Sequence, residues 1–539
     1  MERRALIAVA ISLAILVVYQ EVVLKRLYSP PPGQVDTGQP SAPGPEAPSA
    51  PPPPAEMAPA AEAPRSAPAV GGRDIAIDTD LYRAVVTTAG GRLKSFQLKH
   101  YRASVAPDAP PQEMVSVTGG EYPLGVQLRG KESVSDAGVV YQADRDALEV
   151  SDGGEGQLKL TGTLGDATIT KTLTFHAGTY LLSADIAAAT PTPFGELGVT
   201  WDKGIEPIPE KGLLRLYDQV SLLQGKKVLH EAFDKLAEGM IIEKDIQWAG
   251  YDGRYFMAAL VPRDGDSMRV WLKQRDRTIE TMLLSLPTDG HLTSHLDIYI
   301  GPKDVDTLEV VGHSLARSVE LGYFGFIAVP LLHGLKLSHQ FTGNYGLDII
   351  LLTVVIKVLF IPLTRQSFKS MKEMQKLQPQ MAKIREKFKE QPDQMNKEIM
   401  ELYRRHKVNP LGGCLPMVLQ IPVFIGLYNA LSHAIELRHA PFFLWINDLS
   451  APDRLGTVVL PFVSPPGIPV MTLLMGASMF VQQWMSPNTG DPQQQRVMMI
   501  MPLMFTFMFV SFPAGLTLYW LVNNVLTIGQ QYVINRPER

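Results

Sequence analysis

Cysteine is almost absent from this chain of 539 residues, because Cys414 is the only one. A single cysteine excludes an intrachain disulfide, so an exported domain must be stabilised by its packed core alone. Cys414 lies in a Gly-Gly-Cys-Leu-Pro sequence at the start of an apolar segment, where we expect a buried, unreactive thiol. The sequence therefore favours neither a disulfide-stabilised module nor thiol catalysis.

Motifs for nucleotide chemistry and nucleophilic catalysis are also missing. The chain has no GxxxxGK[ST] phosphate loop, and no spacing ties a nucleophile to a base. A net charge of −4 and a pI near 6.3 give no global argument for nucleic acid as a partner. We therefore expect a protein that is not an enzyme, without a cofactor, a metal ion or sequence-specific nucleic-acid binding.

A run of bilayer-spanning length, residues 346–368, carries a lysine, Lys357, in its middle. Placing a lysine at the centre of a membrane helix costs about 2.5–3.5 kcal/mol on insertion scales, so such a charge normally faces water or a counter-charge. No Asp or Glu occurs in the central part of this or the later apolar segments. We therefore expect a cavity open to water around Lys357. The alternative is that the side chain reaches the inner interface and only orients its helix.

Apolar segments and composition divide the chain into an anchor, a tether, an exported β-domain and a helical membrane region with six spans in all. The predicted boundaries are 1–28 for the N-terminal membrane anchor, 29–72 for the Pro/Ala-rich linker, 73–302 for the β-sandwich domain, 303–343 for a linker and interfacial amphipathic helices, 344–368 for the second span, 369–410 for a cytoplasmic helical hairpin, 411–434 for the third span, 435–467 for an outer loop, 468–486 for the fourth span, 487–496 for a cytoplasmic loop, 497–512 for the fifth span, 516–533 for the sixth span and 534–539 for a cytoplasmic tail.

Alternating apolar and polar residues predict antiparallel strands in the β-domain, for example over 156–164 and 167–175, which a Gly-Asp pair separates. Many such strands over about 230 residues indicate one large β-sandwich. After it, residues 303–320 predict a polar helix. The next stretch predicts a helix at the membrane interface, with Phe326 on the same apolar face as Leu332 and Leu335.

Between Arg365 and Pro410 the chain carries twelve Lys or Arg against six acidic residues, beside two runs of apolar residues at helical spacing. This pattern predicts a helical hairpin, and the positive-inside rule places it in the cytoplasm. Its charges fit a solvated surface, or docking to a ribosome, anionic lipid or an acidic tail. The predicted docking residues, together with two in the loop before the fifth span, are Arg365, Lys369, Lys372, Lys376, Lys383, Arg385, Asp491 and Pro492.

Four stretches of the helical region carry a family resemblance: NPLGGCLPMVLQIPVF, ELRHAPFFLWINDLS, MSPNTGDPQQQ and FPAGLTLYWLVNN, within residues 409–524. They closely resemble the YidC family of bacterial inner-membrane protein insertases, and the order of the predicted elements matches along the whole chain. The resemblance implies a helical membrane protein with a five-helix insertase core. It also implies a periplasmic supersandwich domain, an inner-membrane location and cytoplasmic termini.

The same resemblance implies a hydrophilic groove within the membrane, with a positive charge where Lys357 stands. Most members carry arginine there, so this chain keeps the charge but loses the bidentate fork, which favours a diffuse electrostatic role. Thr353 matches the groove threonine, and Tyr519 with Trp520 matches an aromatic pair in which two tyrosines are usual. With polar groups from other spans, the predicted groove residues are Lys357, Thr353, Gln420, Tyr519, Trp520 and Asn523.

Two apolar faces, on the third and fifth spans, resemble the slide that contacts the substrate helix in this family. The predicted slide residues are Ile421, Phe424, Met504, Phe505 and Met508. The partners implied are nascent membrane proteins, membrane lipids and the Sec translocon, with the ribosome and signal recognition machinery as further candidates. A transporter or channel is the alternative, although paired intramembrane charges and inverted repeats are not evident in the sequence.

Overall fold

The computed structural model describes residues 71–535, apart from gaps at 117–120, 152, 192–193, 205–218, 232–235, 237–238, 264–267, 276–277, 288–291, 320, 407, 409–414, 461–462 and 486–491. The predicted N-terminal anchor, the predicted linker up to residue 70, Cys414, Asp491 and residues 536–539 of the predicted tail lie outside the described residues.

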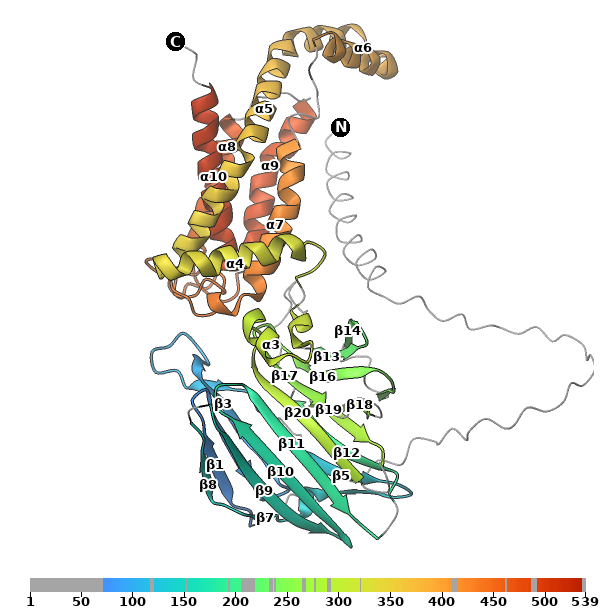
Figure 1. Ribbon diagram of the computed structural model, residues 1–539. Coiled ribbons are helices and arrows are strands. Elements are labelled where there is room, and N and C mark those ends of the chain that lie inside the picture. The colour runs from blue at the N-terminus through green and yellow to red at the C-terminus, as the bar shows by residue number, and fades with distance from the viewer. Residues whose placement is uncertain are drawn as a thin grey trace, which may run out of the picture. The chain divides into compact units, whose positions relative to one another are not determined.

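Residues 74–302 form strands, as the alternating pattern predicts, and these make up three sheets within the described residues (Figure 1). The first sheet has the strand order β4 (Pro111–Glu113), β3 (Arg92–Arg102), β2 (Tyr82–Thr87), β1 (Asp74–Asp78) and β8 (Ala147–Glu149).

The second sheet has the order β14 (Lys227–Glu231), β13 (Gln219–Gln224), β16 (Ile246–Asp252), β17 (Phe256–Pro262), β20 (Leu292–Pro302), β11 (Leu181–Ala189), β10 (Ala167–His176), β9 (Glu155–Leu164) and β7 (Gln142–Ala143). The third has β15 (Met240–Ile242), β18 (Met268–Arg275), β19 (Thr278–Ser285), β12 (Glu196–Gly204), β5 (Gly125–Arg129) and β6 (Ser133–Ser135).

Strand pairing in this β-domain is antiparallel except between β1 and β8, which run parallel. The register between β9 and β10 follows the sequence pattern, because Leu158 pairs with Leu173 and both side chains are fully buried. The apolar faces of the sheets meet in one continuous core, in which Tyr82 stacks on Phe96 with ring centroids 4.3 Å apart. The prediction of a largely β domain over this stretch is confirmed.

Helices occupy the rest of the described chain (Figure 1). They are α3 (Val305–Val311), η4 (Leu315–Ser318), α4 (Gly325–Thr342), α5 (Tyr345–Lys387), α6 (Pro392–Arg405), α7 (Leu415–His433), η6 (Ile435–Leu437), α8 (Val470–Met485), α9 (Pro492–Phe509) and α10 (Ala514–Asn535). Helix α10 packs against α8 and α5, α8 packs against α9, and α4 lies across α7 and α5.

By length and hydropathy, α5 is the one helix of the described part that qualifies as membrane-spanning, and 499–509 is a shorter apolar segment. Helices α7, α8, α9 and α10 overlap the predicted third to sixth spans, but six spans remain a prediction. Helix α9 also begins at Pro492, before the predicted start at 497.

Two local predictions need correction, and two neighbouring predicted elements form one helix. The predicted polar helix over 303–320 is broken after α3 by Gly312, whose φ of 84° lies in the left-handed region that glycine tolerates. The predicted second span and the first hairpin helix form one continuous helix, α5. The single apolar face of α4 is wrong, because Leu332 and Leu335 are buried in the bundle whereas Phe326 is 70% exposed.

Candidate membrane site

Lys357 lies in the apolar first half of α5, half-buried against α10. Its Nζ donates to Thr527 Oγ1 at 2.6 Å and to Asn523 Oδ1 at 3.2 Å. Both acceptors are neutral, and within the described residues Lys357 forms no ion pair with a carboxylate. The sequence predicted that Lys357 lacks a counter-charge, and the structure adds that α10 supplies its hydrogen-bond acceptors.

Two further polar contacts connect α10 to its neighbours. Gln530 Nε2 donates to Thr364 Oγ1 of α5 at 2.6 Å, and Asn524 Nδ2 donates to Ser478 Oγ of α8 at 3.0 Å. The sequence analysis did not single out Gln530, Asn524 or Ser478. A helical-wheel reading of α10 would have found Gln530, because it lies seven residues after Asn523 and so falls on the same face.

The other predicted groove residues surround this contact less directly. Thr353 is 1% exposed, and its hydroxyl donates to the Ile349 carbonyl at 2.6 Å, so its proton is used in a hydrogen bond within α5. Tyr519 is also 1% exposed, and its hydroxyl lies beside the Gln420 side chain of α7. Thus α5, α7 and α10 each contribute polar groups to one region of the bundle.

Trp520 belongs to a different environment from Lys357. Its ring packs edge-to-face on Phe424 of α7 with centroids 4.8 Å apart, and its centroid is 5.7 Å from that of Phe505 of α9. Phe509 completes this aromatic cluster at 5.1 Å. The structure therefore joins Trp520, predicted as a groove residue, to two of the predicted slide residues.

The remaining slide residues are exposed, as a surface facing lipid or a client helix requires. Ile421 is 50% exposed, Met504 38% and Met508 41%. Leu503 and Phe507 on α9 are more exposed still, at 64% and 66%, and the sequence analysis did not name them. Helices α7 and α9 therefore both present apolar side chains outward.

The predicted docking residues lie mainly on the second half of α5, against which α6 folds back. Met374, Leu377 and Met381 of α5 are buried together with Leu402 and Tyr403 of α6, so the predicted helical hairpin has its own small core. Among the docking residues, those on the solvent side are Arg365, Lys369, Lys372, Lys376 and Lys383, while Arg385 is half-buried. Pro492 begins α9.

Lys336 on α4 is a charged residue that the sequence analysis did not identify as part of a site. Its Nζ lies 2.7 Å from Asp304, 2.6 Å from Asp306 and 2.9 Å from Glu436. Partial burial opposes the charge, but the three carboxylates outweigh it and raise the lysine pKa. Because Asp304 caps α3 and Glu436 belongs to η6, Lys336 ties these two elements to α4.

The β-domain contains a second buried lysine, in a dense network of charges. Lys171 Nζ, fully buried, lies 2.6 Å from Asp136 Oδ2 and donates to the carbonyls of Gly90, Gly91 and Leu124. The Tyr141 ring lies under the same ammonium at 4.7 Å. Burial lowers the lysine pKa to about 8, although Asp136 opposes this shift.

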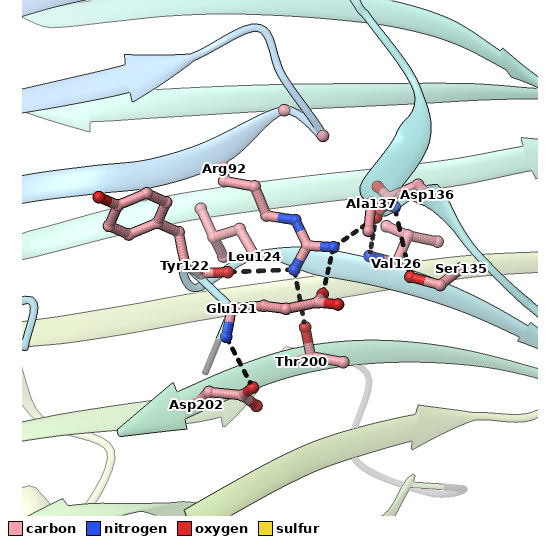
Figure 2. A network of polar contacts seen from close by, with 12 residues as sticks. Arg92, Glu121, Tyr122, Leu124, Val126, Ser135, Asp136, Ala137, Thr200 and Asp202 are labelled. Carbon is pink, nitrogen blue, oxygen red and sulfur yellow. Dashed lines mark hydrogen bonds and ion pairs between the residues drawn. The ribbon is translucent and has the colours of Figure 1, made fainter. Parts of the chain in front are cut away.

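Arg92 extends this network toward β12, as Figure 2 shows. Its guanidinium pairs with Asp136 at 3.0 Å and with Glu121 at 2.7 Å, and the Glu121 amide donates to Asp202 at 3.2 Å. Burial, with the Glu280 and Glu121 carboxylates, raises the Asp202 pKa to about 7. Because Arg92 and Asp136 are 44 residues apart, sequence spacing gave no signal for this cluster.

No cluster of three or more His, Cys, Asp or Glu side chains arranged to hold a metal ion is found within the described residues. The polar groups around Lys357 are amides, hydroxyls and one ammonium. Such groups can donate and accept hydrogen bonds to a peptide and attract a carboxylate, but they do not form a nucleophile–base pair.

Comparison with known proteins agrees with both halves of the chain. Residues 74–333 match the family described as YidC periplasmic domain, and residues 337–539 match the family described as 60Kd inner membrane protein. "Membrane protein insertase YidC" of Citrifermentans bemidjiense is 40% identical over 548 residues, which covers 99% of each chain. The proteins of the same name from Syntrophus aciditrophicus and Syntrophobacter fumaroxidans are 38% and 41% identical, each over 99% of this chain and 100% of its relative. Full-length similarity at this level shows that the chain belongs to the YidC family of membrane protein insertases.

Proposed function

We propose that this chain inserts proteins into the bacterial inner membrane, and that Lys357 is the charge that receives the polar part of a client. The main evidence is that Lys357 donates to two neutral oxygens and forms no ion pair with a carboxylate in the described part of the chain. An ammonium with that environment retains most of its capacity to attract an acidic group, because a charge-assisted pair is stronger than a bond to a neutral oxygen.

The mechanism we propose divides the work between two surfaces. The polar tail of a nascent membrane protein enters a groove lined by Lys357, Gln420 and Asn523. Its apolar segment moves along exposed side chains such as Ile421 and Met508 into lipid. No bond is made, so the free energy comes from burying the apolar segment in lipid, aided by the membrane potential.

We further propose six spans with both termini in the cytoplasm and the β-domain in the periplasm. The arginines near each end of the sequence and the basic surface of α5 and α6 support this orientation through the positive-inside rule. The exposed lysines of that surface are proposed to dock the ribosome or signal recognition machinery. The Sec translocon is a proposed partner for clients with large exported domains.

A transporter or channel is the competing function. It would require a permeating ion or solute to be coordinated inside the bundle, usually by paired charges. The contacts of Lys357 favour the insertase, because they present one unpaired positive charge beside outward-facing apolar helices rather than a closed ion site.

Replacing Lys357 tests the proposal. We expect Lys357→Arg to retain insertion of a small single-span client in cells depleted of their own insertase. Lys357→Ala should reduce insertion, and Lys357→Glu should reduce it by about tenfold or more, since like charges repel the acidic tail. Protease protection of the client tail measures insertion.

Lys131→Ala, which removes an exposed lysine between β5 and β6 of the β-domain, is the matched control and should insert normally. Normal insertion by all three Lys357 variants would show that the charge has no role. Loss of insertion in Lys357→Arg but not in Lys357→Glu would also contradict the electrostatic mechanism.

A further inference from the structure

Helix α10 contacts α5 through two polar bridges on one face. In the first bridge, Lys357 of α5 donates to Thr527 and Asn523 of α10 at 2.6 and 3.2 Å. In the second, Gln530 of α10 donates to Thr364 of α5 at 2.6 Å. The α10 residues recur at intervals of four and three, so they form a continuous polar stripe along that helix.

In both bridges a threonine hydroxyl is the acceptor, because its own proton is used in a hydrogen bond within its helix. Thr527 Oγ1 already donates its proton to the Asn523 carbonyl at 2.6 Å, so only its lone pairs remain for Lys357. Thr364 Oγ1 likewise donates to the Phe360 carbonyl at 2.9 Å and therefore accepts from Gln530. Each bridge can therefore break by loss of its donor, Lys357 or Gln530, while the threonine hydroxyl keeps its hydrogen bond to a carbonyl of its own helix.

The second bridge is also incomplete. Gln530 Oε1 is buried and has no hydrogen-bond partner among the described residues, so closing α10 against α5 leaves one polar atom desolvated. That cost is relieved when the two helices move apart and water or a peptide amide reaches the oxygen. The closed arrangement is therefore held mainly by the Lys357 bridge, whereas the hydrogen bond of the Gln530–Thr364 bridge is partly offset by the desolvated Oε1.

We propose that the two bridges hold α5 and α10 closed in the resting protein. A client carboxylate opens them by taking the Lys357 ammonium from Thr527. Thr527 and Gln530 are then positioning residues. Thr527 holds the Lys357 ammonium and Gln530 helps to set the distance between α5 and α10, and neither contacts the client carboxylate. This inference rests on the proposed insertase function and adds to it a competition between an internal neutral oxygen and the client's acid.

The test uses the full-length protein in liposomes, with a single-span client that carries either Asp or Asn in its translocated tail. Thr527→Val keeps the shape of the side chain but removes the acceptor. We expect it to raise the insertion rate of the Asp client about two- to fivefold, because Lys357 no longer has to leave Thr527, and to leave the Asn client unchanged. Thr527→Ser retains the acceptor and should restore the wild-type rate.

Thr517→Val is the matched control. Thr517 lies on the same helix, is fully buried, and its hydroxyl donates to the Pro513 carbonyl rather than to α5. It should change neither client's rate. An equal change for both clients in Thr527→Val, or no change for either, overturns the competition.

A distance measurement tests the opening without depending on the rate. Spin labels on Gln366→Cys and Val533→Cys, both exposed positions, are placed in a chain with Cys414→Ser. Thr527→Val should shift the label distance between α5 and α10 to longer values, and Thr364→Val should do so to a smaller extent. Unchanged distances in both variants overturn the closed state that we propose.

Failure of this inference is distinguishable from failure of the proposed function. If Lys357→Glu blocks insertion while Thr527→Val changes neither rate nor distance, the insertase function stands and the bridges are only structural. If Lys357→Glu inserts normally, the function of the charge fails whatever the bridges do.

Discussion

Two lysines of this chain, Lys171 in the β-domain and Lys357 on α5, are both withdrawn from water but have different partners. Lys171 is 0% exposed and contacts a carboxylate, three carbonyls and an aromatic ring. Lys357 is half-buried and contacts one amide and one hydroxyl oxygen. The Lys171 charge is therefore paired with a carboxylate inside its domain, whereas the Lys357 charge has only neutral oxygen partners among the described residues.

Under the function proposed above, this difference distinguishes a charge that stabilises the fold from a charge that binds a client. A buried ion that is paired and fully hydrogen-bonded fixes its surroundings, and removing one partner leaves the other uncompensated. An ammonium that is bound only by neutral oxygens can exchange them for a carboxylate with a gain in interaction energy. Substitutions at the two lysines should therefore affect different observables.

The largest expected effect on stability is that of Lys171→Met. Removing the ammonium leaves Asp136 buried beside Tyr141 and Arg92, and breaking such a pair typically costs about 3–5 kcal/mol. Hydrogen exchange of the β10 amides in the full-length protein measures the free energy of opening. Client insertion should persist, because the lysine does not belong to the membrane site.

Two comparisons accompany this variant. Lys159→Met removes an exposed lysine from the neighbouring strand β9 and should leave protection unchanged. Lys357→Met should lower insertion and change protection of α5 by no more than about 1 kcal/mol, since interhelical hydrogen bonds in membranes are weak. A loss of protection below about 1 kcal/mol for Lys171→Met would remove the contrast between the two lysines.

A smaller, pH-dependent effect is expected at Asp202, whose pKa is raised to about 7 from 3.8, mainly by burial. Between pH 3.8 and about 7 the folded protein holds a proton that the unfolded chain has released. The free energy of unfolding therefore falls as pH rises through this window, and becomes flat above it. Asp202→Asn should remove this slope, and should stabilise the β-domain at pH 8 by roughly 1–3 kcal/mol relative to the native residue. Parallel slopes in the two proteins would contradict the raised pKa.

The smallest effect is expected at the surface of α6. Glu401 and Arg405 form an ion pair at 2.6 Å, but the side chains are 47% and 68% exposed. Water and salt screen such a pair, so Glu401→Gln should produce no measurable change in thermal unfolding at physiological salt. A clear destabilisation would show that the hairpin of α5 and α6 depends on its exposed charges rather than on the apolar contacts around Met381 and Tyr403.

Local pattern was enough to predict several elements. Alternation between apolar and polar residues predicted strands such as β9 and β10, because successive side chains of a strand point to opposite faces. Apolar length predicted α5, and the spacing of Met374, Leu377 and Met381 predicted the packing of α6. Four contiguous sequence motifs predicted the family, and the full-length relatives confirm this prediction.

Element boundaries were less accurate where composition and backbone geometry disagree. The change from apolar to basic residues near 368 marks the predicted end of the second span, but a charged side chain does not interrupt backbone hydrogen bonds, so the helix α5 continues to Lys387. The stretch over 303–320, which carries many charged residues, predicted one helix, but the positive φ of Gly312 ends that helix early.

The sequence alone determined that a lysine without a carboxylate partner lies within a membrane-length segment, since both its depth and the scarcity of acidic residues are local properties. Only the tertiary structure decided what that lysine contacts. Thr527 is 170 residues away from Lys357, and Gln530 is 166 residues away from Thr364. These pairings arise from the packing of α10 on α5, which depends on complementary side-chain surfaces along two whole helices; spacing shows which residues share a face of one helix, but not which residue of the other helix each one meets.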